Sequence, residues 1–308
     1  MSQLVVLGSV NADHVLQVPS FPRPGETLLG RNYQVIPGGK GANQAVAAAR
    51  LGADVCFIAS VGDDTFGQNM LDRFRADGID ISKLHVQLQT PTGIAMIQVA
   101  DSGENSICLS AEANDALTEE LVNLNIETIT QADTLLLQLE TPMDGVRRAV
   151  QAAHAAGTQV VLNPAPAQAL DDQLLACVDI ITPNETEAEV LTGVSVTDDL
   201  SAQLAANVLH EKGIDCVLIT LGAKGVWLSM KGDAVVSELI AGFRVQALDT
   251  TAAGDTFNAG LVTAMLEGKT IDEAIRFAHA AAAISVTRFG AQTSIPERSK
   301  VDAFIDAS

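Results

Sequence analysis

Short apolar runs alternate along the whole chain with amphipathic stretches, and this alternation restricts the possible folds more than any other feature. The apolar runs have the length of buried strands and occupy residues 4–8, 55–60, 134–139, 159–162, 179–182 and 216–220. The stretches that place apolar residues three or four apart, as in a helix with one buried face, include residues 65–77, 142–156, 201–212 and 271–286. Repeated strand-then-helix units predict a mostly parallel sheet covered by helices.

Two segments break the alternation and carry no helical pattern. Residues 13–36 contain β-type runs around a Pro-Arg-Pro-Gly turn, and residues 93–110 have the pattern of a hairpin that turns at residues 101–104. We expect these segments to pair into a small extra sheet, which would suit a lid over a site. The predicted organisation is a single α/β domain, residues 1–308, with a lid formed by about residues 12–37 and 92–110.

Composition and charge narrow the classes of function. The chain has 308 residues, 47% of them hydrophobic, which is enough for a sizeable core. Its net charge is −20 and no cluster of Lys and Arg stands out, which argues against nucleic acid or an anionic membrane as a partner. An anionic substrate would need local devices such as helix N-termini, backbone amides or a metal ion.

The cysteines and the apolar segments indicate a reduced, cytoplasmic protein. Cys56, Cys108, Cys177 and Cys216 are far apart and lie in or near apolar runs, so we expect buried thiols rather than disulfides or a zinc site. The first apolar run is predicted to be a strand rather than a signal peptide, and residues 278–286 are too short an apolar stretch to span a membrane.

Ligands of open α/β sheets bind at the carboxyl ends of the strands, so the residues that follow each strand are the candidates. An amide and a carboxylate, Asn11 and Asp13, follow the first strand and could hold adjacent hydroxyls, although a polar strand end explains them equally. Glu140, after a later strand, is by itself a weak signal. Residues 38–43, Gly-Gly-Lys-Gly-Ala-Asn, open a predicted helix and would let a ligand approach the backbone, or form only a tight turn.

Two further loops each allow a structural and a functional interpretation. Asn184 and Glu187 have the spacing of a helix capping box, which accounts for them without a function; a place near phosphate and metal-bound water is the alternative. The loop at residues 220–225, Thr-Leu-Gly-Ala-Lys-Gly, is either a turn into the next strand or a set of amides and a lysine for nucleotide phosphates.

The most informative segment is residues 249–258, Asp-Thr-Thr-Ala-Ala-Gly-Asp-Thr-Phe-Asn. A helix is predicted to begin near Ala252 to Gly254, so free amides and the positive end of the helix dipole would point one way. Asp255 lies in that first turn. This couples an anion hole to a base, and the two would supply the charge stabilisation and the positioning on which phosphoryl transfer depends. An ordinary acidic first turn is the alternative.

Other enzyme classes lack their signatures. The histidines are scattered and no H-E-x-x-H is present, and a G-x-S-x-G elbow, a Walker A loop and a G-x-G-x-x-G after a strand are all missing from the sequence.

Residues 38–43 and 249–255 together resemble the signature segments of the PfkB-type carbohydrate kinases. The resemblance covers essentially the whole chain and includes residues 8–13, 183–188 and 276–283. The Asn-Ala-Asp at residues 11–13 and the stretch 162–167 are most similar to members that act on ribose. The resemblance implies a three-layer α/β/α sandwich with a small β-sheet lid, and ATP-dependent phosphorylation of D-ribose at O5 with Mg-ATP as the phosphoryl donor.

The resemblance also implies roles for individual residues. Asp255 would be the general base, and the amides of Ala252, Ala253 and Gly254 would form the anion hole. The sugar contacts would be Asn11, Ala12, Asp13, Gly39, Lys40, Gly41, Ala42, Asn43, Glu140 and Asp255. The ATP contacts would be Asn184, Thr220, Leu221, Gly222, Ala223, Lys224, Gly225, Gly254, Asp255 and His279.

Metal ions and a partner subunit are implied in the same way. An activating potassium ion would be held by Asp249, Thr251, Ser285, Arg288, Gly290 and Ser294, and Asn184 with Glu187 would form the magnesium and phosphate motif. Two lids would interlock in a homodimer. Many relatives have Gly where this chain has Ala252, and we expect no consequence, because Ala tolerates the φ angles found at helix starts.

Alternatives remain open at this point. A kinase of deoxyribose, fructose or adenosine would use the same Asp255 machinery and differ only in its sugar pocket. A sensor that binds sugar without catalysis is the alternative from another class, because fold does not determine function.

Overall fold

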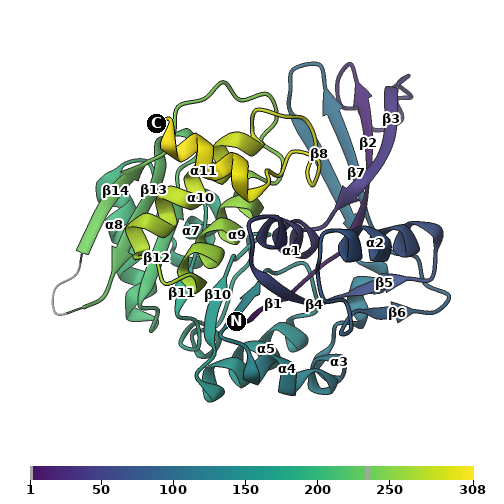
Figure 1. Cartoon of the computed structure of the whole chain (residues 1–308). Helices are drawn as coiled ribbons and strands as arrows, with labels where there is room; N and C mark the ends of the chain where they lie inside the picture. The colour runs from purple at the N-terminus through teal and green to yellow at the C-terminus, as the bar shows by residue number, and fades with distance from the viewer. Residues whose placement is uncertain (1–2, 233–235) are drawn as a thin grey trace.

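The computed structural model describes residues 3–232 and 236–308, and its centre is an eight-stranded sheet (Figure 1). The strands, in spatial order, are β14 (Val236–Ala241), β13 (Gly225–Met230), β12 (Cys216–Thr220), β11 (Ile180–Ile181), β10 (Gln159–Leu162), β9 (Thr134–Leu137), β1 (Gln3–Leu7) and β4 (Asp54–Ile58). The strands from β12 to β4 run parallel to one another, β13 pairs antiparallel with β12, and β14 pairs antiparallel with β13. Every strand predicted for the main sheet is present.

Helices cover both faces of this sheet. One face carries α1 (Lys40–Arg50), α2 (Thr65–Ala76), α9 (Ala253–Leu266), α10 (Ile271–Ser285) and α11 (Arg298–Asp306). The other carries α3 (Glu119–Leu124), α4 (Ile126–Gln131), α5 (Met143–Ala156), α6 (Asp172–Leu175), α7 (Glu185–Thr192) and α8 (Asp199–Glu211). The predicted three-layer α/β/α sandwich is therefore confirmed.

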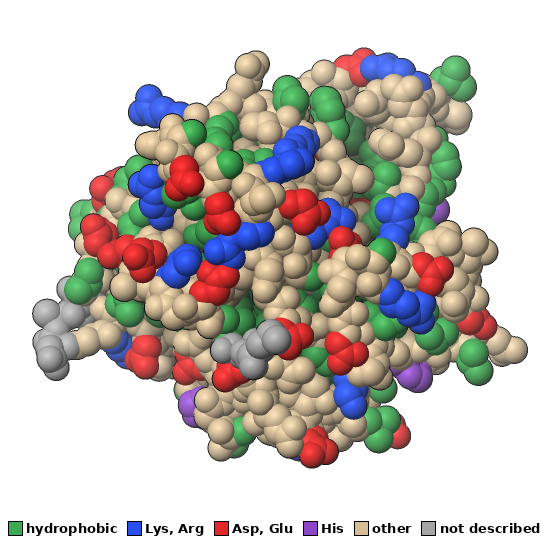
Figure 2. All heavy atoms as spheres, in the orientation of Figure 1, with side chains coloured by type: hydrophobic (Ala, Val, Ile, Leu, Met, Phe, Trp, Pro, Cys, Tyr) green, Lys and Arg blue, Asp and Glu red, His purple; other side chains and the backbone are tan. Residues whose placement is uncertain are grey.

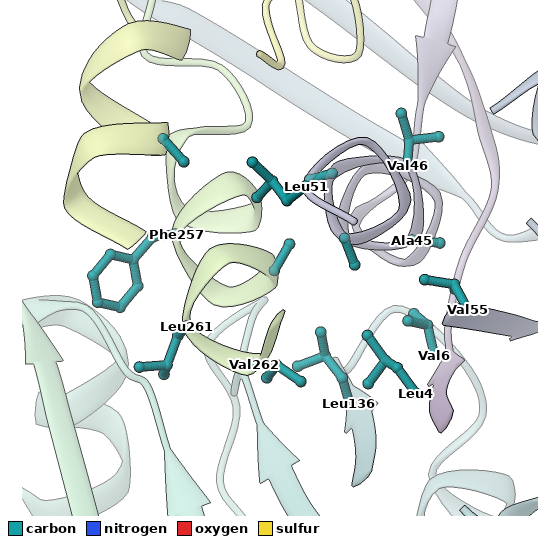
Figure 3. Close-up of a cluster of buried hydrophobic side chains, with 14 of the residues drawn as sticks. Leu4, Val6, Ala45, Val46, Leu51, Val55, Leu136, Phe257, Leu261 and Val262 are labelled. Atoms are coloured by element: carbon teal, nitrogen blue, oxygen red, sulfur yellow. The ribbon is translucent and has the colours of Figure 1, made fainter. Parts of the chain in front are cut away.

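The alternation of side chains along β1 separates the two cores. Leu4 and Val6 belong to one buried cluster, and Val5 and Leu7 belong to the other. Figure 3 shows Leu4 and Val6 directed toward the layer formed by α1 and α9. Because both faces of β1 are covered, its sequence is a continuous apolar run rather than an alternating one.

A smaller, separate sheet contains the two segments without helical pattern. Its order is β3 (Arg31–Gly38), β2 (Asn11–Val18), β7 (Gly93–Ala100) and β8 (Asn105–Ser110), and it projects from the main body in Figure 1. The predicted hairpin is β7 and β8, which pair antiparallel. A further two-stranded ladder of β5 (Ser60–Gly62) and β6 (His85–Gln87) was not predicted.

The expectation that all cysteines are buried is wrong for two of them. Cys56 and Cys216 are buried in the main sheet, but Cys108 on β8 is exposed and Cys177, just after α6, is partly exposed. Cys108 is exposed because β8 belongs to the small sheet, which has no helical layer over it within the described residues. An apolar run there does not indicate burial.

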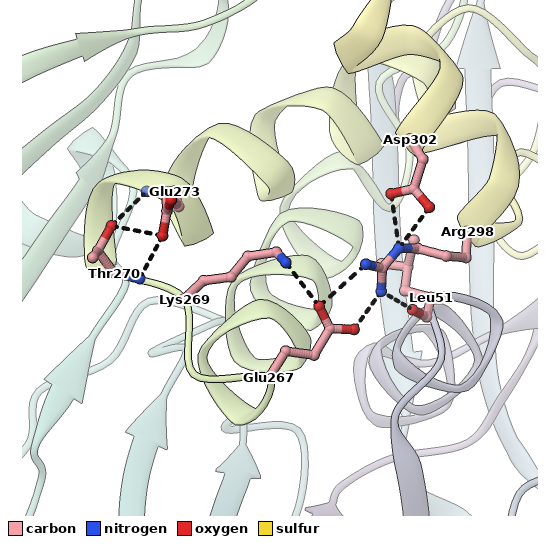
Figure 4. Close-up of polar contacts among 7 residues, drawn as sticks. All are labelled: Leu51, Glu267, Lys269, Thr270, Glu273, Arg298 and Asp302. Carbon is pink, nitrogen blue, oxygen red and sulfur yellow. Dashed lines mark hydrogen bonds and ion pairs between the residues drawn. The ribbon is translucent and has the colours of Figure 1, made fainter.

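The C-terminal helix α11, which the sequence did not predict, is attached to the body through Arg298 (Figure 4). The Arg298 guanidinium contacts Glu267 at the end of α9 and donates to the Leu51 carbonyl at the end of α1, at 3.1 Å. Its Nε atom lies 2.8 Å from Asp302, and its charge lies 4.7 Å from the centre of the Phe277 ring. One side chain thus connects α11 to α1, α9 and α10 of the same layer.

Acidic and basic side chains are interspersed on the face of the molecule drawn in Figure 2, without a continuous basic patch there. No helix in the described part of the chain is both long and apolar enough to cross a membrane.

Candidate active site

The start of α1 lies directly against the end of β1. Gly39 has a φ of 90°, a value that favours glycine, and a Cβ on Gly41 would lie 2.5 Å from the backbone of Gly8. This close approach, fixed by the Ala42 amide donating to the Ser9 carbonyl at 2.9 Å, brings the first turn of α1 to the carboxyl edge of the sheet. The glycine pattern at residues 38–43 is therefore required for packing, and it also places Lys40 and Asn43 at the site.

The carboxylate of Asp255 is buried in the first turn of α9 and has two amide donors. Asn43 Nδ2 donates to Oδ2 at 2.9 Å, and Gln44 Nε2 donates to Oδ1 at 3.0 Å. Burial raises the pKa of Asp255, while the charge of Lys40 and the two amide donors oppose this rise. A carboxylate held in this way has both oxygens in a fixed orientation and is poised to accept a proton.

Several charged side chains share this region. Burial, and then the charges of Glu140 and Asp255, raise the pKa of Asp13 to about 7. Burial lowers the pKa of Lys40, but Asp255, Glu140, Glu187 and Asp13 outweigh it, so the net shift is upward. Lys40 therefore stays a cation and is the counter-charge of the cluster.

Glu140 is the predicted strand-end carboxylate after β9. Its Oε2 accepts from the Ser9 hydroxyl at 2.5 Å and from the Lys40 amide at 3.1 Å. It lines a cavity of about 270 Å³ together with Asn11 and with Leu109 of the small sheet. The small sheet thus contributes to the wall of the site on the side of the predicted sugar contacts.

A second cavity, of about 230 Å³, brings together most of the remaining predicted residues. It is lined by Lys40, Asn163, Ala165, Thr182, Asn184, Glu187, Thr220, Thr250, Ala252, Ala253, Gly254, Asp255 and Asn258. Within it, Asn184 and Glu187 form a complete capping box at the start of α7, as their spacing indicated. This box uses Asn184 Oδ1 and Glu187 Oε2, at 2.8 and 2.9 Å. Burial raises the pKa of Glu187.

The backbone at Ala252 corrects one expectation. Ala252 is the N-cap of α9 and has a φ of 59°, in the left-handed region, rather than the ordinary helix-start angle that we expected Ala to adopt. The Ala253 amide donates to the Thr250 carbonyl at 3.2 Å and closes a turn in which Ala252 is the third residue, the position that takes a positive φ in a type II turn. Ala at this position therefore carries backbone strain that Gly would not.

The structure places some predicted nucleotide residues outside this cavity. Gly222, Ala223 and Lys224 form a short, exposed 3-10 turn after β12, with Leu221 and Gly225 at its two ends. His279 is buried on α10 with its ring 5.3 Å from that of Phe257, and burial lowers its pKa to about 4. A neutral imidazole therefore lies there, and its Nδ1 has no hydrogen-bond partner among the described residues.

Two of the predicted potassium residues, Thr251 and Gly290, donate to Asp249. Its Oδ1 accepts from the Thr251 amide at 2.9 Å, and its Oδ2 accepts from the Gly290 amide at 2.8 Å. Although burial acts in the other direction, these hydrogen bonds hold the pKa of Asp249 below its usual value. Ser285 is the last residue of α10, and its carbonyl accepts from the Arg288 amide at 3.1 Å. The carbonyl of the next residue, Val286, accepts from the Asp249 amide at 3.2 Å. Ser294 is buried and donates to Ala291 O.

Sequence reasoning missed the buried amides that surround Asp255. Gln44 contacts it directly, and Gln138 and Asn163 contact Gln44. Asn114 was also missed, although its Nδ2 donates to Asn11 Oδ1 at 2.9 Å. A polar residue in an alanine-rich helix such as α1 is the signal that could have revealed Gln44, because a buried amide needs partners.

An α/β sheet that carries, at its carboxyl edge, a buried carboxylate in the first turn of a helix beside an open cavity is the arrangement of a phosphotransferase acting on hydroxyl groups. The family model for pfkB family carbohydrate kinases matches residues 1–298. The chain therefore belongs to the pfkB family, and it is a carbohydrate kinase.

Individual relatives agree with this assignment over their whole length. Ribokinase of Haemophilus influenzae is 60% identical over 98% of this chain and 98% of its own. The crystal structure of a ribokinase from Thermotoga maritima has a TM-score of 0.89 at 38% identity, covering 99% of each chain. The structure of Arabidopsis thaliana ribokinase complexed with ribose and ATP has a TM-score of 0.91 at 35% identity, covering 100% of each chain.

Proposed function

We propose that this carbohydrate kinase transfers the γ-phosphoryl group of Mg-ATP to O5 of D-ribose, giving D-ribose 5-phosphate and ADP. The observation that supports it most is the Asp255 carboxylate, buried in the first turn of α9 and held by Asn43 and Gln44 at the wall of the cavity. The choice of ribose rests on the similarity to ribokinases, at 60% identity for the Haemophilus enzyme.

In this proposal, Asp255 is the general base. It accepts the proton of the O5 hydroxyl while that oxygen attacks the γ-phosphorus and ADP leaves. A positioned base contributes roughly 10²–10⁴-fold to a rate. Burial raises the pKa of Asp255 although Lys40 opposes the rise, so the carboxylate is a stronger base than an exposed aspartate.

The amides at the start of α9 are proposed to stabilise the transferred phosphoryl group. The first N–H groups of a helix have no intrahelical partners and lie at the positive end of its dipole. Gly254 leaves the approach open, since a Cβ there would meet nothing within 4 Å. The Ala253 amide, which donates to Thr250 in this structure, would change partner when phosphate binds.

The residues near the cavity fit Mg-ATP better than a dedicated metal cage. The capping box leaves Asn184 Nδ2 and Glu187 Oε1 free of its own hydrogen bonds, one donor for phosphate and one acceptor for metal-bound water. In the described residues, no group of three or more His, Cys, Asp or Glu side chains is arranged for a metal ion. Magnesium that keeps its waters and binds mainly through phosphates would suit this donor set.

A potassium ion is proposed as an activator beside the loop that leads into α9. The Asp249 carboxylate and the backbone and hydroxyl oxygens of Ser285 and Ser294 would supply only oxygen ligands, which suit a hard monovalent cation. Asp249 also bonds Thr251 and Gly290. The ion would hold this loop and therefore the start of α9.

The small sheet is proposed to act as a lid and as the interface of a homodimer. Strand register puts Asp13 on the face toward the site, while Val35, Met96 and Cys108 lie on the opposite face. Val35 and Met96 are 40% and 55% exposed, and a second lid packed on this face would cover them. Sedimentation that shows only monomer at micromolar concentration would contradict the dimer.

The test of the proposed function is ADP release from ATP with ribose, deoxyribose, fructose and adenosine as acceptors, each in potassium and in sodium. Fast, potassium-stimulated turnover with ribose alone supports the whole proposal. Preference for another acceptor would keep the mechanism and change the substrate. Binding of ribose without any turnover would support a sensor instead. Little ATP hydrolysis without sugar is expected if the lid excludes water.

A further inference from the structure

We infer that a one-directional chain of buried side-chain amides, Gln138 to Gln44 to Asn163, positions the Asp255 carboxylate for proton transfer. The inference deepens the proposed function and rests on it. Gln44 acts on Asp255 directly, whereas Gln138 and Asn163 act through Gln44. All are positioning residues and none is expected to touch the sugar.

The geometry assigns every hydrogen of the Gln44 amide. Its Nε2 donates to Asp255 Oδ1 at 3.0 Å and to Asn163 Oδ1 at 3.1 Å. Its Oε1 accepts from Gln138 Nε2 at 2.5 Å. Gln44 is fully buried and Gln138 is 1% exposed, so water does not compete for these groups.

The direction of the chain is set at its far end. Asn163 Nδ2 donates to the backbone carbonyl of Thr182 at 3.3 Å, and a carbonyl can only accept. Asn163 must therefore present its oxygen to Gln44, and Gln44 must present its nitrogen to both Asn163 and Asp255. A reversed Gln44 would turn Oε1 toward two acceptor oxygens.

Gln138 fixes the orientation of the Gln44 amide, but it leaves one of its own polar atoms without a hydrogen bond. Its own Oε1 is buried without a hydrogen-bond partner in the described part of the chain, and a Cβ on Gly8 would lie 2.1 Å from that atom. An unpaired buried oxygen is unfavourable. Reversing the Gln138 amide would not remove the problem, because it would place two carbonyl oxygens together at the contact with Gln44. The arrangement keeps the donor to Gln44 and leaves the other oxygen unpaired.

The chain meets Asp255 inside a charged cluster. The groups that face Asp255 are Lys40 from α1, Glu140 after β9, Asp13 of β2 and Glu187 of α7. Three of these four carry negative charge when ionised and oppose ionisation of Asp255, so its amide donors matter more here than they would beside cations. Removal of Gln44 leaves Asn43 as the only side-chain donor to the carboxylate among the described residues.

The experiment measures kcat and KM for ribose in the full chain between about pH 5.5 and pH 9, for wild type and the variants Gln44→Met, Gln138→Met and Gln138→Glu. Thr263→Val is the matched control, because Thr263 is a buried polar residue on α9 whose hydroxyl has no partner within residues 3–232 and 236–308. Thermal melting checks that each variant folds.

For Gln44→Met, kcat is expected to fall about 10- to 100-fold with KM changed less than about 3-fold, and the acidic limb of kcat should move to higher pH. Gln138→Met should shift both readouts in the same direction by less. Gln138→Glu can donate only when protonated, so its kcat relative to wild type should decrease as pH rises.

Wild-type kcat and an unshifted pH profile in both methionine variants would overturn the inference, as would an equal loss in Thr263→Val. Should Gln44→Met fail to fold, Gln138→Met decides alone, because Gln138 donates to Gln44 rather than to Asp255. Lack of ribose turnover in wild type is a separate result, which would refute the proposed function and this inference with it.

Discussion

Asn43 Nδ2 donates to Asp255 Oδ2 at 2.9 Å, joining two residues that lie 212 positions apart in the sequence. The contact connects the first turn of α1 to the first turn of α9. It shows why the two signature segments have to occur together: each supplies half of a single buried carboxylate site.

Replacing Asp255 by Ala is expected to lower kcat by roughly 10²–10⁴-fold, because the proposed general base is lost. Ribose should still bind, since Asn11, Asp13 and Glu140 are untouched. ADP release measures turnover, and titration calorimetry measures binding. Asp272→Ala, at an exposed aspartate in the first turn of α10, is the matched control. Near-normal turnover of Asp255→Ala would contradict the assignment.

Replacing Ala252 by Gly is expected to stabilise the protein. A left-handed residue with a Cβ costs about 1–2 kcal/mol, and the extra freedom of Gly in the unfolded chain returns about 0.4–1 kcal/mol of that. The φ of 59° at Ala252 therefore predicts a net gain of about 0.5–1 kcal/mol in the free energy of unfolding, measured with urea. Ala252→Val should lose stability. A less stable Gly variant would show that the strain is absent in solution.

Asp13 should make the stability of the ligand-free protein depend on pH. Its pKa is raised from 3.8 to about 7, so above about pH 4 the unfolded chain has lost a proton that the folded state still holds. The contribution of Asp13 to the free energy of unfolding is thus complete at low pH and is lost as pH rises toward about 7.

Asp13→Asn removes this titration. Wild type loses the contribution of Asp13 as pH rises, and the variant does not. The free energy of unfolding of the variant minus that of wild type should therefore be larger at about pH 8 than at about pH 5, by about 1–4 kcal/mol. Urea unfolding at the two pH values measures the change, and Asp272→Asn is the control that should show none. A difference that does not vary with pH would mean that Asp13 ionises normally.

Replacing Arg298 by Met is expected to lower the free energy of unfolding by about 1–3 kcal/mol, since a partly buried network and a cation–π contact are lost together. Turnover should be unchanged, because Arg298 contacts the far ends of α1 and α9 rather than the site. The exposed pair of Arg75 and Asp72 offers a control: Arg75→Met should cost less than about 0.5 kcal/mol. Equal losses in the two variants would refute the network.

The main sheet could be predicted from the sequence because both of its faces are covered. Strands such as β1 and β12 are continuous apolar runs, and a short run of this kind is typical of a strand that is buried on both faces. The exposed strand β14 and the helix α11 have no continuous apolar run, because each buries only part of one face. Their positions depend on contacts with distant elements, as Arg298 illustrates.

The candidate site was predictable at its strand ends and helix starts, and less so inside. Asp255 and Glu187 stand at local patterns that a sequence displays. The role of Gln44 depends on a hydrogen bond to Gln138, which lies 94 positions away in the sequence. The positive φ at Ala252 depends on how the chain enters α9, and no local pattern at that residue specifies it.

The peptide carbonyl of Thr182 has a consequence for how this site can change over time. A side chain that orients a catalytic group can be altered by one substitution, but a backbone carbonyl at the end of β11 is present whatever residue occupies the position. The backbone of the sheet therefore fixes the direction of the hydrogen bonds that lead to Asp255. Sequence drift can weaken the chain of amides, but it cannot reverse it without moving a strand.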